Sequence, residues 1–249
     1  MCRTITIAAL ISFVSAVLGG QTLPALPQFE VASIKPIDPA NPQKSVNLRG
    51  GELKATSYSL KNLIQLGWDV RSFQVLGGPA WLDSDKYDVD AKPAVPLEIF
   101  ASEGMRQFRL MVQSLLAGRF RLKLHPETQE MRVYFLVVGR NGPSPKRTAE
   151  AVGPGTSMRD GKGRLTATQI DMGMLAHDLG GELGVAVIDK TNLDGAFDIT
   201  LEWNPDEDAS GSSPSIFTAI QEQLGLKLDV GRGPVEILRV DHAERPSEN

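Results

Sequence analysis

Three histidines and a single cysteine are the side chains of this 249-residue chain best suited to nucleophilic, general-base or metal chemistry. His125, His177 and His242 stand too far apart for the His-x3-His spacing by which one helix presents two ligands to zinc. Asp241 and His242 are neighbours at the end of an expected strand, so their side chains should point to opposite faces. We therefore expect surface or strand-edge histidines, although His125 and His242 both lie near strand ends and could meet in the fold.

Glycine-rich and acidic stretches give no stronger chemical signal. The Gly-x-Ser-x-Gly elbow of many hydrolases does not occur. Segment 155–163 lacks the spacing of a phosphate-binding loop and has no Ser or Thr after Lys162. The acidic triplet 206–208 lacks the alternating oxygen ligands of a calcium loop. Asp88 and Asp90 share one face of a strand and are expected to face water. The sequence therefore assigns no catalytic, cofactor-binding or metal-binding residue.

The three tryptophans are the strongest remaining candidates for a binding surface. Trp68 and Trp81 flank a Gly-Gly-Pro turn at 77–79, and Trp203 ends an expected strand in the other half of the chain. Exposed tryptophans could form an aromatic platform for a ligand. Because tryptophan is large and mostly buried in folded proteins, we expect these three side chains to close the hydrophobic cores.

The first twenty residues have the layout of an export signal. Arg3 provides a positive start, an apolar run follows from 5 to 18, and Val17 and Gly19 are small enough for cleavage after Gly19. The run is shorter than the roughly 20 apolar residues that span a bilayer comfortably, although an uncleaved anchor is the alternative. We predict a signal peptide over 1–19 and a mature protein in the periplasm or outside the cell, with no further membrane span.

Cleavage at this position also removes the only cysteine, Cys2. The mature chain is then expected to be cysteine-free, with neither disulfides nor thiol chemistry. The formal net charge of the full chain is −4, which argues against a nucleic-acid partner. The partner is expected to be an unidentified protein of the cell envelope or a small ligand, and no cofactor is predicted.

The chain compares well with itself at an offset of 112 residues. Segment 51–56 (GELKAT) matches 163–168 (GRLTAT), and each is followed by a helix N-cap residue, Ser59 or Asp171. The two helices are expected to end near Gly67 and Gly180. Farther along, Leu82-Asp83 and 87–89 match Leu193-Asp194 and 197–199 and are predicted to be strands. These ordered matches indicate an internal duplication.

A second pair of segments follows in the same order in each half. An amphipathic helix is predicted over 108–118, and another begins at Ser213-Pro214 and ends at Gly225. Two hairpins are predicted next. One joins 120–124 to 133–138 through a turn at Pro126, and the other joins 226–228 to 235–240 through the glycines and proline at 231–234.

These observations predict an α+β protein with two degenerate repeats, each strand-helix-strand-strand-helix-hairpin, after the signal peptide. The first repeat covers 28–140 and the second covers 163–243. Between them, 141–162 is expected to be a linker rich in Pro, Gly and Ser, and 244–249 a polar tail. A strand at 29–34 has no visible counterpart before the second repeat. The sequence leaves open whether the repeats are separate domains or share one sheet.

Five ordered motifs resemble a known family: FEVASIKP at 29–36, GGPAWL at 77–82, LLAGRF at 115–120, QLGLKL at 223–228 and DHAERPSEN at 241–249. The resemblance is to soil-associated, exported bacterial proteins of unassigned function with many paralogues per genome. It implies export and an α+β module. Some of these relatives carry the module beside a membrane metallopeptidase of the β-lactam-sensor type, which implies extracytoplasmic sensing. This chain has no His-Glu-x-x-His motif, and the family supplies no catalytic residues to carry over.

The functional expectation is an exported, non-enzymatic binding or interaction module of unknown ligand, suited to partner recognition that includes strand addition at a sheet edge. One alternative is a hydrolase with an unrecognised site that uses His125, His242 or the carboxylates near Asp88. That alternative requires a histidine within hydrogen-bond reach of a buried carboxylate inside a cleft. Another is a structural component of the cell envelope.

Overall fold

The computed structural model describes residues 26–37, 43–99, 102–140, 142–143, 145–148, 157–161, 163–205 and 214–246. The predicted signal peptide and the acidic triplet 206–208 lie outside these ranges, as do residues 155, 156 and 162 of the glycine-rich segment 155–163. The fold is α+β, with helices packed beside three four-stranded sheets. Within the described ranges, no helix combines the length and the apolar character that crossing a membrane would require.

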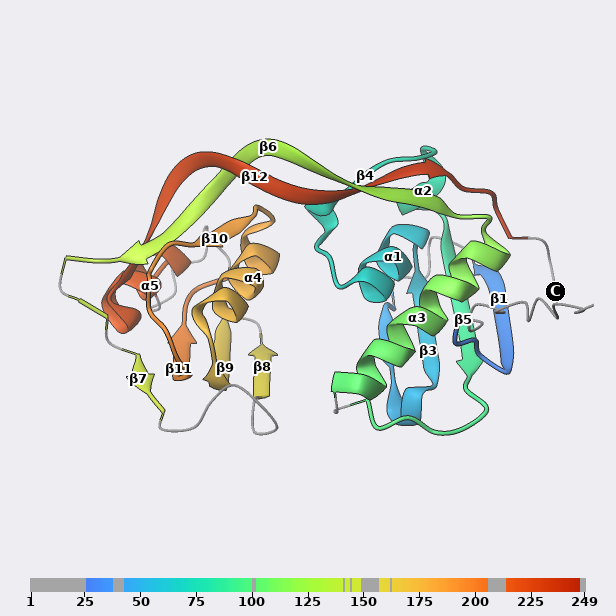
Figure 1. Cartoon of the computed structure of the whole chain (residues 1–249), viewed down its shortest axis with the longest axis horizontal. Helices are drawn as coiled ribbons and strands as arrows, with labels where there is room; N and C mark the ends of the chain where they lie inside the picture. Colours follow the sequence, from blue (N-terminus) through green and yellow to red (C-terminus); the bar gives the residue numbers. More distant parts are fainter. Residues whose placement is uncertain are drawn as a thin grey trace, which may run out of the picture.

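The first lobe is an antiparallel sheet in the order β1-β5-β3-β2, with helices on one face (Figure 1). Strand β3 alternates between buried and more exposed side chains, as a strand with one covered face should. The elements of this lobe are β1 (Val31–Ile37), β2 (Ser45–Asn47), β3 (Leu53–Tyr58), α1 (Leu60–Trp68), α2 (Trp81–Ser84), β5 (Lys86–Lys92) and α3 (Ser102–Arg119).

The second lobe has the sheet order β7-β11-β9-β8, which repeats the first order when strands are matched by their position in each half. Two of its strands, β7 and β8, lie in the segment predicted as a linker, and β7 pairs with β11 as β1 pairs with β5. The elements are β7 (Lys146–Arg147), β8 (Ser157–Gly161), β9 (Arg164–Ile170), α4 (Met172–Leu183), β11 (Phe197–Glu202) and α5 (Ile216–Leu224).

A long two-stranded ribbon spans both lobes (Figure 1). Strands β6 (Lys123–Val138) and β12 (Leu226–His242) pair antiparallel along nearly their whole length. Strand β10 (Val187–Asp189) lies parallel to β6, and β4 (Val75–Gly77) lies parallel to β12. Each short edge strand therefore pairs with the long strand of the opposite half, and the two halves share this third sheet in addition to having one each.

The two predicted hairpins are wrong, because each is one continuous strand of the ribbon. Tyr134 donates its backbone N–H to Ala186, on the side of β6 away from β12. Backbone groups point alternately toward and away from the partner strand, so Pro126, eight residues before Tyr134, also points away from β12. Pro234 lies opposite a residue of β6 that points away in the same manner, so Pro234 itself points away from β6. The edge strands cover only Tyr134–Leu136 of β6 and Leu238–Val240 of β12. Neither proline therefore costs the ribbon a hydrogen bond.

The glycines predicted to turn the second hairpin serve close packing instead. A Cβ atom on Gly231 would overlap the ring of Phe135 on the neighbouring strand, and one on Gly233 would lie 3.0 Å from Cδ1 of Ile188. Glycine in a strand often marks such a close approach. The glycine-proline cluster is therefore a packing feature of a long strand.

The N-caps of α1 and α4 were predicted correctly, whereas the predicted end of α4 is wrong. The side chains of Ser59 and Asp171 accept hydrogen bonds from backbone N–H groups in the first turns of α1 and α4, as N-caps do. Helix α4 continues past Gly180 and ends at Gly184, which has the left-handed φ of 64°. Gly180 is buried because α4 packs closely there, since an added Cβ would lie 3.3 Å from the Val185 carbonyl oxygen.

Three smaller predictions also need correction. Leu82 lies in the short helix α2, and Leu193 lies outside any strand. The first of the two central strands in each half comes earlier, as β4 and β10. The N-cap of α5 is Ser215, which accepts from the Thr218 N–H, rather than the predicted Ser213. Short apolar matches in the sequence located these regions but did not predict the secondary structure of each residue.

The ribbon contributes to both cores. Leu238 and Val240 of β12 are buried in the core of the first lobe, and Leu136 of β6 is buried in the core of the second. A third, smaller cluster lies at the middle of the ribbon, where Val133, Val235 and Ile237 are buried against partly buried side chains that include Phe73 and Ile188. The two lobes are therefore held by apolar packing of the ribbon in three clusters as well as by backbone pairing.

The close contact at Gly231 can be tested by substitution. Gly231→Ala should lower the free energy of unfolding by about 1–3 kcal/mol, because the Phe135 ring must move out of a packed position. Urea denaturation of the purified protein measures the change. The control is Gly118→Ala near the end of α3, where nothing lies within 4 Å of the added Cβ and alanine should stabilise by about 0.5–1 kcal/mol. A neutral Gly231→Ala variant would contradict the packing role.

Candidate functional site

Each histidine of the ribbon has a carboxylate partner, but neither pair is buried. Nδ1 of His125 lies 2.9 Å from Oδ2 of Asp241, with side-chain exposures of 50% and 46%. Nε2 of His242 lies 2.9 Å from Oε1 of Glu244, with exposures of 46% and 59%. The hydrolase alternative required a buried carboxylate inside a cleft, and these two pairs do not meet that condition.

The carboxylates near Asp88 have a structural task that sequence analysis missed. Asp88 accepts a hydrogen bond from the backbone N–H of Ser57, whose φ is 60°. In the second lobe, Asp198 accepts in the same way from Gln169, whose φ is 56°. Each acceptor faces a residue in the sparsely populated left-handed region, at an irregular point in strand pairing. Asp90 is exposed, as predicted.

The tryptophans belong to the hydrophobic cores. Trp203 is 6% exposed and lies in the core of the second lobe. Trp68 and Trp81 are partly buried against the core of the first lobe, and the Arg245 guanidinium lies 5.2 Å from the centre of the Trp81 ring. The three side chains are thus divided between two cores and do not form one aromatic platform.

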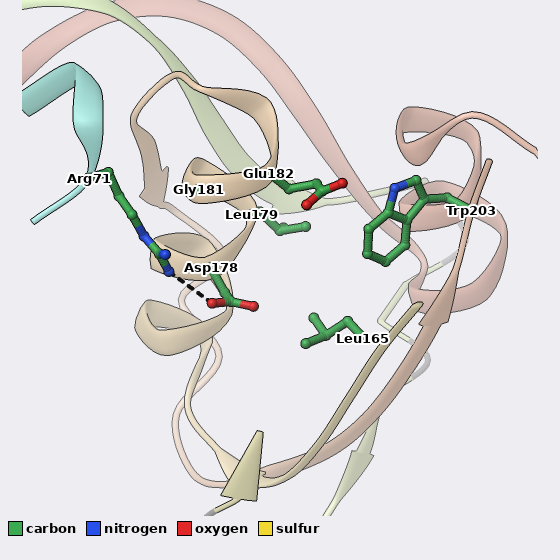
Figure 2. Close-up of a pocket in the computed structure, with 7 residues that line it drawn as sticks. All are labelled: Arg71, Leu165, Asp178, Leu179, Gly181, Glu182 and Trp203. Atoms are coloured by element: carbon green, nitrogen blue, oxygen red, sulfur yellow. Dashed lines mark hydrogen bonds and ion pairs between the residues drawn. The ribbon is translucent and has the colours of Figure 1, made fainter. Parts of the chain in front are cut away.

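A cavity of about 210 Å³ lies where the lobes meet (Figure 2). Arg71 follows α1 of the first lobe and reaches across to α4, where its Nη2 atom is 2.9 Å from Oδ1 of Asp178. Leu165 comes from β9, and Trp203 follows β11. Together the cavity is lined by Arg71, Leu165, Asp178, Leu179, Gly181, Glu182 and Trp203.

Helix α4 is built to receive Arg71. Asp178, Gly181 and Glu182 stand at i, i+3 and i+4, so they share one face of the helix. A Cβ atom on Gly181 would lie 2.8 Å from Cζ of Arg71, so the absence of a side chain lets the guanidinium reach the helix. Asp178 has a side-chain exposure of only 14%, which reduces the solvent screening of the ion pair.

Two donors at this cavity have no hydrogen-bond acceptor among the residues that the structure describes. Nε1 of Trp203 and Nε of Arg71 are buried, and neither has a partner in the structure. More than nine in ten buried polar groups in proteins are hydrogen-bonded, so an unpaired donor indicates a missing acceptor such as a water or a ligand atom. Figure 2 shows the nitrogen edge of the Trp203 indole on the side of Glu182, and Arg71 with Asp178 on the opposite side of the cavity.

Arg71 also lines two neighbouring cavities of about 320 and 360 Å³, and His177 of α4 lines both of these. The His177 side chain keeps some contact with solvent. Partial desolvation, followed by the nearby Arg71 guanidinium, nevertheless holds its pKa below the ordinary value of 6.5. Arg109 of the first lobe acts in the same direction. The carboxylates of Asp69 and Asp178 act in the opposite direction, so the lowered pKa of His177 is the net result of desolvation and of the charges on both sides.

Sequence reasoning did not identify Arg71, Asp178 or Glu182. The signal that could have found two of them is the self-comparison, because the 112-residue offset places Asp178 opposite Leu66 and Glu182 opposite Val70. At both positions an acidic residue of the second copy stands where the first copy has an apolar one. In the described part of the chain, His, Cys, Asp and Glu side chains form no group of three or more that could hold a metal ion.

The model of one protein family matches residues 61–243, and that family is described as a protein of unknown function (DUF3738). The match covers most of the chain and includes α1, both long strands of the ribbon and all the cavity residues. The chain belongs to this family. Comparisons with curated proteins and with solved structures give no match.

The ion pair between the lobes should be energetically coupled. A double-mutant cycle with Arg71→Met and Asp178→Asn should give a coupling of about 1–2 kcal/mol, because the pair is partly shielded from water. Urea unfolding of the four proteins measures it. The comparison pair is Arg106 and Glu103 on α3, whose side chains are 62% and 59% exposed, and its coupling should be smaller. Equal couplings would contradict the proposed difference in shielding.

The titration of His177 provides a second test of the contact between lobes. In the wild-type protein the pKa of His177 should lie below 6.5, and Arg71→Met should raise it, because a neighbouring positive charge is lost. Imidazole proton shifts followed by NMR against pH measure both values. The control is Arg106→Met, which removes an exposed arginine that is not among the charges acting on His177 and should leave the His177 titration unchanged. An unchanged His177 titration would mean that Arg71 does not approach α4 in solution.

Proposed function

We propose that this protein is an exported binding module that holds a small ligand where its two lobes meet. The observation that carries this proposal is the buried indole N–H of Trp203, which lines the cavity and has no acceptor in the described part of the chain. A ligand oxygen would satisfy this donor, and one at the Arg71 side could satisfy Nε of Arg71. Small-molecule sites occur preferentially at interfaces between domains, as this cavity does.

The position of the cavity supports a sensing role. Arg71 comes from one lobe, and the remaining lining residues come from the other. A ligand that contacts both sides binds better to one arrangement of the lobes than to others, and this difference is what shifts a conformational equilibrium. The ribbon joins the lobes, so a change at the cavity is transmitted to both ends of β6 and β12.

The other interpretations have less support. The histidine–carboxylate pairs of the ribbon are exposed, which gives a hydrolase no shielded base. Strand addition along the ribbon is hindered because Pro126 and Pro234 remove outward-facing donors from its open stretches. The cavity, in contrast, offers paired polar groups and apolar walls in one place.

The family and the N-terminal sequence suggest where this binding takes place. We propose that the protein is an exported member of a soil-associated group with many paralogues per genome, some linked to a β-lactam-sensor-type metallopeptidase. Export would place the cavity in the periplasm or outside the cell, where it is in contact with small molecules from the environment. We also propose that the lobes descend from one duplicated unit, which the shared strand order supports.

Export can be measured directly. When the full chain is produced in a bacterium with its own leader, the mature protein should be recovered from the periplasm or medium, beginning at Gly20. Intact-mass spectrometry gives the N-terminus. A version with Arg3→Glu and charged residues placed within the apolar run is the control and should stay in the cytoplasm. Recovery of the uncleaved chain in the membrane fraction would contradict the proposed cleavage.

Binding can be tested with small metabolites that fit the cavity. At least one compound of about ten non-hydrogen atoms or fewer should raise the melting temperature, because a ligand that binds only the native state stabilises it. Trp203→Phe keeps an aromatic ring but removes the donor, so the shift should shrink. Trp68→Phe, in the other lobe, should retain the full shift. A folded wild-type protein that responds to no compound would contradict the proposal.

A further inference from the structure

The charges around the cavity are unequal. Arg71 and Asp178 compensate one another through their ion pair. Glu182 is the remaining charged group of the lining, and it has no cationic partner within the described ranges. Its side chain comes from the exposed side of α4 and points toward the cavity in Figure 2. The lining thus carries one uncompensated negative charge, which favours a ligand with a positive group.

The same end of the cavity requires an oxygen. The Trp203 indole is nine-tenths buried, its Nε1–H lacks an acceptor, and its nitrogen edge faces the Glu182 side. An indole N–H donates only, so the ligand atom beside it must be an acceptor. A ligand that meets both demands carries a cation and an oxygen close together.

The volume limits the rest of the ligand. A cavity of about 210 Å³ corresponds to about seven water molecules at roughly 30 Å³ each. Leu165 and Leu179 provide apolar wall. A short hydrocarbon segment fits such a wall, and a ligand of a few non-hydrogen atoms fills a volume of this size.

We propose that the cavity binds a compact primary ammonium compound that carries an oxygen acceptor one or two carbons from the nitrogen. Free amino acids and small amino alcohols share this chemistry. The ammonium group pairs with Glu182, and the oxygen accepts from Nε1 of Trp203. This inference rests on the proposed binding function and names its ligand class.

The site needs both a positive group and an oxygen acceptor, which excludes ligands that carry only one of the two. A plain carboxylate brings a second negative charge next to Glu182 and supplies no donor. A plain alkylamine satisfies Glu182 but leaves the indole N–H unpaired, and a buried unpaired donor is costly. Selectivity between ligands should therefore depend on the presence of both groups in one molecule.

The test uses four probes with the purified mature protein: ethanolamine, alanine, propylamine and propionate. Isothermal titration calorimetry or ligand-observed NMR should give a Kd on the order of 0.1–1 mM for ethanolamine or alanine, as expected for ligands of this size. Propylamine should bind about tenfold or more weakly, because it leaves the indole unpaired. Propionate should not bind. Preference for alanine over ethanolamine would identify the acceptor as a carboxylate rather than a hydroxyl.

Two substitutions separate the two contacts. Glu182→Gln should weaken ethanolamine and propylamine by about tenfold or more, because both lose the ionic contact. Trp203→Phe should weaken ethanolamine but leave the already weak propylamine unchanged. Glu222→Gln on the exposed surface of α5 and Trp68→Phe are matched controls and should bind as the wild type does. Because Glu182 is at the surface, its variant remains informative even if Trp203→Phe folds poorly.

The outcomes distinguish the ligand class from the function. Equal binding of propylamine and ethanolamine, or wild-type affinity in Glu182→Gln, would overturn the proposed class. If propionate or a metabolite without nitrogen binds in a Trp203-dependent way, the class is wrong and the binding function stands. If neither the four probes nor the metabolite set binds to folded protein, both proposals fail.

Discussion

The antiparallel pairing of β6 with β12 is the interaction on which the rest of the structure depends. Each strand begins beside one lobe and ends beside the other, so its apolar residues enter different cores along its length. Leu136 is buried in the second lobe and Val240 in the first, and Val133 and Ile237 are buried between them. Separating the strands would expose all three clusters at once. The ribbon therefore couples the folding of the lobes and fixes their distance.

The candidate site follows from that constraint. With the lobes held together, Arg71 in the segment after α1 can reach α4, where it forms an ion pair with Asp178. Gly181 makes the approach possible. The lobes are alike in strand order, yet the residues at the site differ between the two halves, since α4 carries Asp178 and Glu182 where the first half has Leu66 and Val70. The fold thus explains why the two lobes meet at a cavity. The sequence differences between the halves explain why α4 presents polar side chains to that cavity.

Local sequence signals predicted the α+β class, the helix starts at Ser59 and Asp171, and the burial of Trp203, since each depends on neighbours in the chain or on residue type. The hairpins were mispredicted because glycine and proline occur both in turns and in strands with an open edge or close side-chain packing. Their presence in the sequence does not distinguish the two. Strands β7 and β8 were missed because short polar strands have no apolar period. The Arg71–Asp178 contact joins residues 107 positions apart, and no local pattern predicts it.

The most direct test of ligand binding between the lobes is the indole N–H signal of Trp203 in a ¹H–¹⁵N NMR spectrum. The chain has three tryptophans, so three indole signals are expected, and Trp→Phe variants assign them. On titration with ethanolamine or alanine, the account predicts a saturable downfield shift of the Trp203 signal as its proton gains an acceptor, with Trp68 and Trp81 unmoved. Saturable binding that leaves the Trp203 signal in place would contradict it.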